Sequence, residues 1–148
     1  MNRFTHEIRV YWEDTDAGGI VFYANYLKFM ERARTEWLRA MGVQQQLLRD
    51  ETGGMFVVTE TQVRYHRPAR LDDLLCVSAE LKHMGQASIT LSQQVVLAAD
   101  PTYKLAEGTI RIGWVEAATL RPVRMPGALL GTLERHRAPS TEEPHRRT

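Results

Sequence analysis

The stretch NYLKFMERARTEWLRAMG, residues 25–42, decides the fold of this chain. Its apolar side chains recur every three or four residues, as they do along one face of an amphipathic helix. These side chains are Tyr26, Phe29, Met30, Ala33, Trp37 and Met41. Asn25 is a residue type that caps helices at their start, and Gly42 is one that ends them. The pattern predicts a single helix about 25 Å long, which can cross a whole small sheet.

On both sides of this helix, apolar and polar residues alternate, which is the pattern of half-buried strands. Before the helix, Ile8, Val10 and Trp12 share one side of a predicted strand over residues 6–12. After it, four more strands are expected over residues 55–66, 75–82, 89–97 and 103–116. The short turns between these strands predict an antiparallel meander, and Pro126 can open a last short helix through His136.

This element order predicts an α+β fold, a curved antiparallel sheet of about five strands wrapped around one long central helix. The length of 148 residues suits one domain, which we place at residues 1–133. Residues 134–148, ERHRAPSTEEPHRRT, hold no large apolar side chain and are expected to form a flexible polar tail. The edges and outer face of such a sheet need covering, so we expect a homodimer or a larger homo-oligomer.

The charge balance excludes one class of function. The chain has 19 Lys and Arg against 18 Asp and Glu, and without the tail 15 of each remain. A dedicated nucleic-acid binder usually carries a large basic excess, so no nucleic-acid partner is expected. An anionic ligand would have to be met by a local cluster of cations.

Cysteine usage and hydropathy bear on the compartment. Cys76 is the single cysteine, which excludes an intramolecular disulfide and favours a reducing, cytoplasmic location. It lies in an alternating strand and is interpreted as sheet packing. The first residues lack the apolar core of a signal peptide, and no stretch approaches 18 uncharged apolar residues, so we expect no membrane span. The five histidines are scattered, and no metal site is expected.

The acidic turn Glu13-Asp14-Thr15-Asp16-Ala17-Gly18-Gly19 leads toward the start of the long helix. A helix start offers unpaired N–H groups and a partial positive charge, which can polarise a carbonyl oxygen. A carboxylate beside it, such as Asp16, could act as general base or nucleophile on the carbonyl carbon. The alternative is structural, with Asp14 and Asp16 serving as turn and capping residues.

Residues 10–26 and 29–36, together with the Pro68-Ala69-Arg70-Leu71-Asp72-Asp73 stretch, resemble the hotdog-fold acyl-CoA thioesterases. Within them the chain looks closest to the YbgC-like branch of the 4-hydroxybenzoyl-CoA thioesterase family, whose genes neighbour the Tol–Pal envelope system. The resemblance spans roughly residues 6–133. It implies hydrolysis of acyl-CoA to free acid and CoA by a homodimer or homotetramer, with coenzyme A as part of the substrate and no separate cofactor.

The resemblance also assigns two residues. Asp16 matches the catalytic carboxylate, as general base or nucleophile. Tyr23 matches the position whose backbone N–H polarises the thioester carbonyl, and many members of the branch have histidine there. A thioester needs little more machinery, because its carbonyl is electrophilic and a thiolate of pKa near 8.5 leaves readily.

Coenzyme A is polyanionic, and Arg64, Arg67 and Arg70 are the candidate local cations. A solvated charged loop is the alternative interpretation of these three residues. Two other functions stay open at this point. One is a non-catalytic module that binds acyl-CoA or acyl carrier protein. The other is dehydration of a 3-hydroxyacyl thioester, which in related folds uses a histidine at the helix, and no histidine lies between residues 7 and 65.

Overall fold

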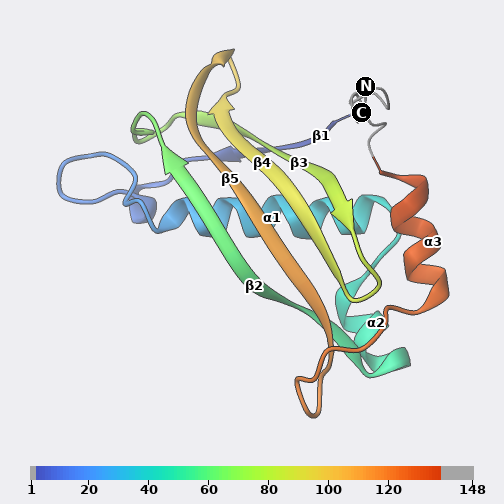
Figure 1. Cartoon of the computed structure of the whole chain (residues 1–148). Coiled ribbons are helices and arrows are strands. Elements are labelled where there is room, and N and C mark those ends of the chain that lie inside the picture. Colours follow the sequence, from blue (N-terminus) through green and yellow to red (C-terminus); the bar gives the residue numbers. More distant parts are fainter. Residues whose placement is uncertain (1–2, 138–148) are drawn as a thin grey trace.

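The computed structural model describes residues 3–137, and in it five antiparallel strands form one sheet that curves over a long helix (Figure 1). This confirms the expected fold class. In chain order the elements are β1 (Phe4–Arg9), the 3-10 turn η1 (Trp12–Asp14), α1 (Asn25–Ala40), α2 (Gln45–Thr52), β2 (Gly54–Tyr65), β3 (Leu74–Met84), β4 (Ser88–Leu97), β5 (Asp100–Glu116) and α3 (Gly127–Arg135).

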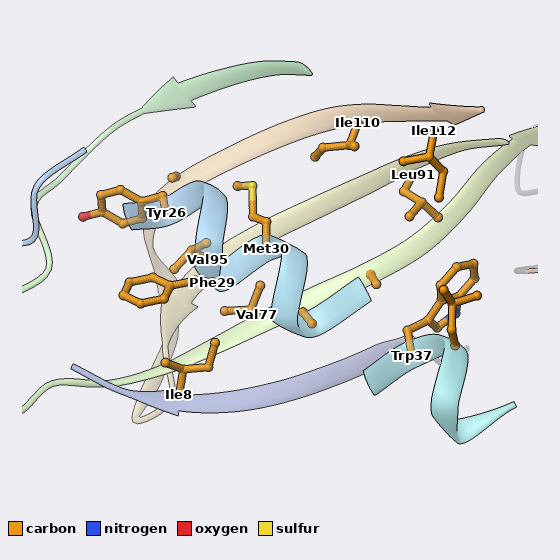
Figure 2. Close-up of a cluster of buried hydrophobic side chains, with 14 of the residues drawn as sticks. Ile8, Tyr26, Phe29, Met30, Trp37, Val77, Leu91, Val95, Ile110 and Ile112 are labelled. Carbon is orange, nitrogen blue, oxygen red and sulfur yellow. The ribbon is translucent and has the colours of Figure 1, made fainter. Parts of the chain in front are cut away.

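The core lies between α1 and the inner face of the sheet (Figure 2). The predicted stripe of α1 is the buried one, since Phe29, Met30 and Ala33 are fully buried. Facing them are alternate residues of the strands, because successive strand side chains point to opposite faces. The labelled members are Val77 of β3, Leu91 and Val95 of β4, and Ile110 and Ile112 of β5.

The core between α1 and the sheet also contains a buried polar side chain, that of Gln93. Gln93 of β4 is fully buried, and its amide nitrogen donates to the carbonyl oxygens of Met30, 3.0 Å away in α1, and Ser78, 3.1 Å away in β3. Its amide oxygen accepts a hydrogen bond of 3.0 Å from Nη1 of Arg34 in α1. All polar groups of the Gln93 amide are therefore engaged, which burial requires. The helix is fixed to the sheet by these bonds as well as by packing.

The strand order β1-β3-β4-β5-β2 differs from the expected meander at one point. Strands β3, β4 and β5 are sequential neighbours, as predicted. Strand β2 pairs with β5 at the far edge of the sheet instead of with β3. The reason is that residues 66–73 connect β2 and β3 across the sheet, and part of this connection pairs with the loop before α1 through Ile20 and Arg70.

The chain between β1 and α1 departs from the prediction in two ways. Strand β1 ends at Arg9, and the side chain of Trp12 is 83% exposed instead of lying on the inner side with Ile8 and Val10. The cause is local, because the Asp14 carboxylate captures the Tyr11 backbone N–H at 2.8 Å and turns the chain into η1. Asn25 is not the cap of α1, whose N-cap residue is Ala24, without a side-chain hydrogen bond.

The helices α2 and α3 also differ from the prediction or extend beyond its limits. The short helix α2 was not predicted, and it ends at Gly53 in the left-handed conformation with φ of 78°. The last predicted helix is present as α3, which includes the first two residues of the expected tail. Residues 138–148 of that tail lie outside the described residues.

Candidate active site

The Asp16 side chain lies at the tip of a tight turn that precedes α1. The turn is closed by backbone hydrogen bonds from Asp16 N to Ile20 O at 2.8 Å and from Gly19 N to Asp16 O at 3.0 Å. Gly19 has φ of 81°, which favours glycine. The Asp16 carboxylate is exposed, and its Oδ1 accepts the Gly18 N–H at 2.8 Å. Within residues 3–137 no donor occupies Oδ2, so one carboxylate oxygen faces solvent.

The neighbouring carboxylate has a different role. Asp14 is buried, at 9% exposure, and its Oδ2 accepts the Tyr11 N–H. Its carbonyl oxygen accepts the Phe22 N–H at 3.2 Å and the side-chain amide of Asn25 at 2.8 Å. Asp14 therefore ties the acidic turn to the start of α1, which fits the structural alternative for this residue. These bonds bring the chain that carries Asp16 back to the helix start.

The Tyr23 peptide lies one residue before the N-cap of α1. Its carbonyl accepts the Tyr26 N–H at 3.2 Å, and the preceding Phe22 carbonyl accepts the Asn25 N–H at 2.9 Å. No acceptor for the Tyr23 N–H occurs in the part of the chain that the structure describes. An unpaired N–H at a helix start is a ready donor to an anion or a polarised carbonyl oxygen.

Residues 69 and 70, in the segment that follows β2, form backbone contacts with the end of the Asp16 turn. Val21 N donates to Ala69 O at 2.9 Å, and Ile20 forms an antiparallel bridge with Arg70. The Ala69 N–H in turn donates to the phenol oxygen of Tyr26 at 2.9 Å, and both Ala69 and Tyr26 are buried. Figure 2 shows Tyr26 in the first turn of α1, with its hydroxyl pointing away from the core cluster. Burial raises the pKa of the Tyr26 phenol, so it stays protonated at neutral pH.

The three candidate arginines do not form one cluster. Arg64 lies opposite Glu107 of β5, on the outer face of the sheet, in a shallow polar hollow of about 500 Å³ that Ser92 and Thr109 also line. Arg67 stacks over the Tyr103 ring, 4.6 Å from its centroid. Arg70 is the one that borders the Asp16 turn, through Ile20. Only Arg64 lies within β2, and the chain bends away from the sheet after Tyr65, so the three side chains are carried to different places.

Sequence reasoning missed an aromatic cluster at the helix start. Tyr65, the last residue of β2, packs edge-on against Tyr23 and Tyr26, with ring centroids 5.9 and 5.4 Å away. The Phe22 ring lies 4.8 Å from that of Tyr23. The alternation along β2 could have placed Tyr65 on the inner face, but no sequence signal pairs it with Tyr23.

Two kinds of feature are absent from residues 3–137, a metal-binding cluster and a membrane-spanning helix. Within residues 3–137 no three His, Cys, Asp or Glu side chains are grouped so that they could hold a metal ion. None of the helices described there is long and apolar enough to cross a membrane. Cys76 is half-buried in β3, between Glu7 of β1 and Val96 of β4, as expected of a sheet residue.

The fold is the hotdog fold, with an acidic turn and an open helix start as its candidate site. A family model described as the thioesterase superfamily matches residues 18–103. The chain is 41% identical over 125 residues to a Haemophilus influenzae protein named acyl-CoA thioesterase YbgC, covering 84% of this chain and 90% of that protein. The chain therefore belongs to the thioesterase superfamily.

Solved structures agree with this assignment. A probable thioesterase from Bartonella henselae superposes with a TM-score of 0.77 at 29% identity, covering 84% of this chain and 100% of that one. A 1,4-dihydroxy-2-naphthoyl-CoA thioesterase from Synechocystis superposes with a TM-score of 0.81 at 18% identity, covering 89% and 96%. The second likeness shows the fold alone.

Proposed function

We propose that this thioesterase hydrolyses acyl-CoA to a free acid and CoA, with Asp16 as the catalytic carboxylate and the Tyr23 N–H as the donor to the thioester oxygen. The observation that carries the proposal is that one loop before α1 carries both an exposed carboxylate oxygen, on Asp16, and an unpaired N–H at the helix start, on Tyr23. The Haemophilus influenzae relative named acyl-CoA thioesterase supports the substrate class.

The chemistry needs few groups. The Tyr23 N–H and the positive end of α1 stabilise negative charge that develops on the carbonyl oxygen. As general base, Asp16 takes a proton from water while the water oxygen bonds to the carbonyl carbon. As nucleophile, its own oxygen forms that bond, and water later cleaves the resulting anhydride. In both cases the C–S bond breaks and the thiolate leaves with the bonding electrons, which a thiol pKa near 8.5 makes easy.

The substrate is tested with the purified chain and a panel of acyl-CoAs. The panel contains short, medium and long aliphatic chains and an aromatic acyl group, and released CoA is measured with a thiol reagent. The proposal predicts hydrolysis of at least one member, and acyl carrier protein thioesters are assayed in parallel as alternative donors. Absence of thiol release above the uncatalysed rate with every acyl-CoA would overturn it.

We assign coenzyme A recognition first to Arg70, among the three candidates. Its support is position, since Arg70 borders the Asp16 turn through Ile20, whereas Arg64 lies on the outer face of the sheet. The Michaelis constants for acyl-CoA and for truncated acyl-pantetheine are compared in Arg64→Ala, Arg67→Ala and Arg70→Ala. Arg70→Ala should raise the constant for acyl-CoA and leave that for acyl-pantetheine unchanged. Equal values in all variants would remove the assignment.

We also propose that the chain works as a homodimer or homotetramer in the cytoplasm. The oligomer is supported by β2, an edge strand of 12 residues whose free side is paired with no other strand among residues 3–137. A long unpaired edge is a template for association, so natural proteins cover it. Light scattering on the eluting protein should give two or four chain masses, and a monomer would contradict the proposal. The compartment rests on the single cysteine, and fractionation of the producing cells tests it.

A further inference from the structure

The start of α1 has no side-chain cap and is held by backbone groups, since the Asp14 carbonyl accepts the Phe22 N–H and the Asn25 side-chain amide, and the Phe22 carbonyl accepts the Asn25 N–H at 2.9 Å. Its N-cap, Ala24, has no side chain that can hydrogen-bond, and the Tyr26 N–H to Tyr23 O bond of 3.2 Å is at the long end of the usual range. The Tyr23 side chain is 62% exposed, so core packing does not hold it. Yet hydrolysis as proposed above needs the Tyr23 N–H in one fixed direction, because an oxyanion donor acts through preorganisation.

Tyr65 adds a side-chain constraint to these backbone bonds. It lies at the end of the edge strand β2, in register with Ala106 of β5, so its own backbone is held by the sheet. Figure 1 shows this end of β2 on the same side of the molecule as the loop that leads into α1. Its ring meets Tyr23 at 82° and Tyr26 at 60°, in the edge-on arrangement that aromatic pairs prefer.

We propose that Tyr65 is a positioning residue of the thioesterase, whose ring holds the Tyr23 side chain and so supports the direction that the backbone bonds give to the Tyr23 N–H. This inference rests on the proposed function. Tyr26 forms the second contact and is itself anchored by the Ala69 N–H, so the ring of Tyr65 connects the helix start to a rigid support.

The aromatic ring of Tyr65, not its hydroxyl, has this role. Burial first, and then the nearby Tyr23, raise the pKa of the Tyr65 phenol, so it carries no charge at neutral pH and is a poor base. Tyr65→Phe keeps the ring and both contacts. Tyr65→Leu keeps an apolar side chain but removes both aromatic contacts.

Steady-state kinetics with an acyl-CoA that the wild-type protein hydrolyses test the inference. Misplacing a catalytic donor by about 1 Å can cost on the order of 100-fold in rate. We expect Tyr65→Leu to lower kcat by roughly 10- to 100-fold with KM within about twofold, and Tyr65→Phe to keep kcat within about twofold.

Phe56→Leu is the matched control. Phe56 lies on the same strand and packs edge-on against Trp114, with centroids 4.9 Å apart, but at the other end of β2. Its loss should lower the thermal midpoint about as much as Tyr65→Leu does and leave kcat unchanged. A fall in kcat equal to that of Tyr65→Leu would show that the effect is general loosening of the sheet and would overturn the proposal.

Tyr23→Leu provides a second route should Tyr65→Leu fail to fold, because the exposed Tyr23 ring can be removed with its peptide N–H intact. The single variants should lose kcat similarly, and the double variant should lose little more, since both remove one contact. If the kcat of the double variant falls by the product of the two single-variant factors, the two side chains act independently and the inference is contradicted. A wild-type kcat in Tyr65→Leu, with activity still dependent on Asp16, would refute the positioning role and leave the proposed function standing. A wild-type protein without thioesterase activity would refute the function itself.

Discussion

The buried amide of Gln93 offers a quantitative test of how the long helix is held against the sheet. Gln93→Met keeps a side chain of similar length and shape but removes the three hydrogen bonds to Met30, Ser78 and Arg34. The two bonds to carbonyl oxygens contribute about 0.5–1.5 kcal/mol each, and the bond from the charged guanidinium about 1.5–3 kcal/mol.

The loss is partly offset, because the methionine buries an apolar side chain that contributes about 1.5–3 kcal/mol. The loss of stability is increased by Arg34, because its Nη1 loses its acceptor in the variant. The Arg34 guanidinium is already desolvated by burial, which lowers its pKa. We therefore expect the free energy of unfolding to fall by about 2–4 kcal/mol. For a chain of this length that corresponds to a thermal midpoint lower by roughly 5–15 °C.

The control is Gln94→Met, at the next position of β4. Gln94 points to the outer face and its side chain accepts a hydrogen bond from Arg3 near the surface. This substitution should change the free energy of unfolding by less than about 0.5 kcal/mol, as surface changes usually do. Urea denaturation followed by circular dichroism measures both variants. Equal stabilities of the two variants would refute the argument that the Gln93 amide holds α1 to the sheet.

Three further substitutions probe other contacts, and unfolding equilibria measure each. Tyr26→Phe leaves the buried Ala69 N–H without its acceptor and should cost about 1–3 kcal/mol; a loss below about 0.5 kcal/mol would count against that bond. Gly54→Ala would drive a methyl group into the Trp114 indole and should cost about 1–3 kcal/mol or more, whereas Gly127→Ala meets no atom within 4 Å and should not destabilise; equal effects would argue against this packing. The pKa of Glu107 is lowered by hydrogen bonds, first from His66 and then from Lys104. The charged carboxylate therefore stabilises the fold above the ordinary carboxyl pKa, and this stabilisation is lost as the pH falls through the lowered pKa. Glu107→Gln should thus be slightly less stable than wild type at pH 7, and the difference should close below about pH 4; a difference that persists in acid would contradict the assignment.

Local patterns predicted much of the fold correctly. The period of residues 25–42 is enough to place α1 and its buried face, because both depend on the spacing of apolar residues along one segment. The strands were likewise predicted to within a few residues of their observed limits. The exposure of Trp12 could not be predicted from alternation, since it depends on competition between strand pairing and the Asp14 carboxylate for the Tyr11 N–H.

Features that depend on distant segments were the ones missed. Short turns correctly indicated that β3, β4 and β5 are neighbours, but the pairing of β2 with β5 joins residues about fifty apart in sequence. The same limit applies to the site. Asp16 and Tyr23 lie seven residues apart in the loop before α1, so the sequence alone can propose them together, whereas the contact between Tyr23 and Tyr65 depends on where the edge of the sheet falls. The arginines near Tyr65 are close in sequence, yet they are separated because only Arg64 lies in β2 and the chain bends away after Tyr65.

Catalysis as proposed depends on the Asp16 carboxylate, and one substitution tests this role most directly. Asp16→Asn keeps an oxygen that can accept the Gly18 N–H, so the turn is preserved while the charge and basicity are lost. Glu13→Gln removes an exposed carboxylate of the same acidic turn and serves as the control. With an acyl-CoA that the wild-type protein hydrolyses, we expect kcat to fall by roughly 100-fold or more in Asp16→Asn and to stay unchanged in Glu13→Gln. Hydrolysis by Asp16→Asn at the wild-type rate would contradict the catalytic role of Asp16.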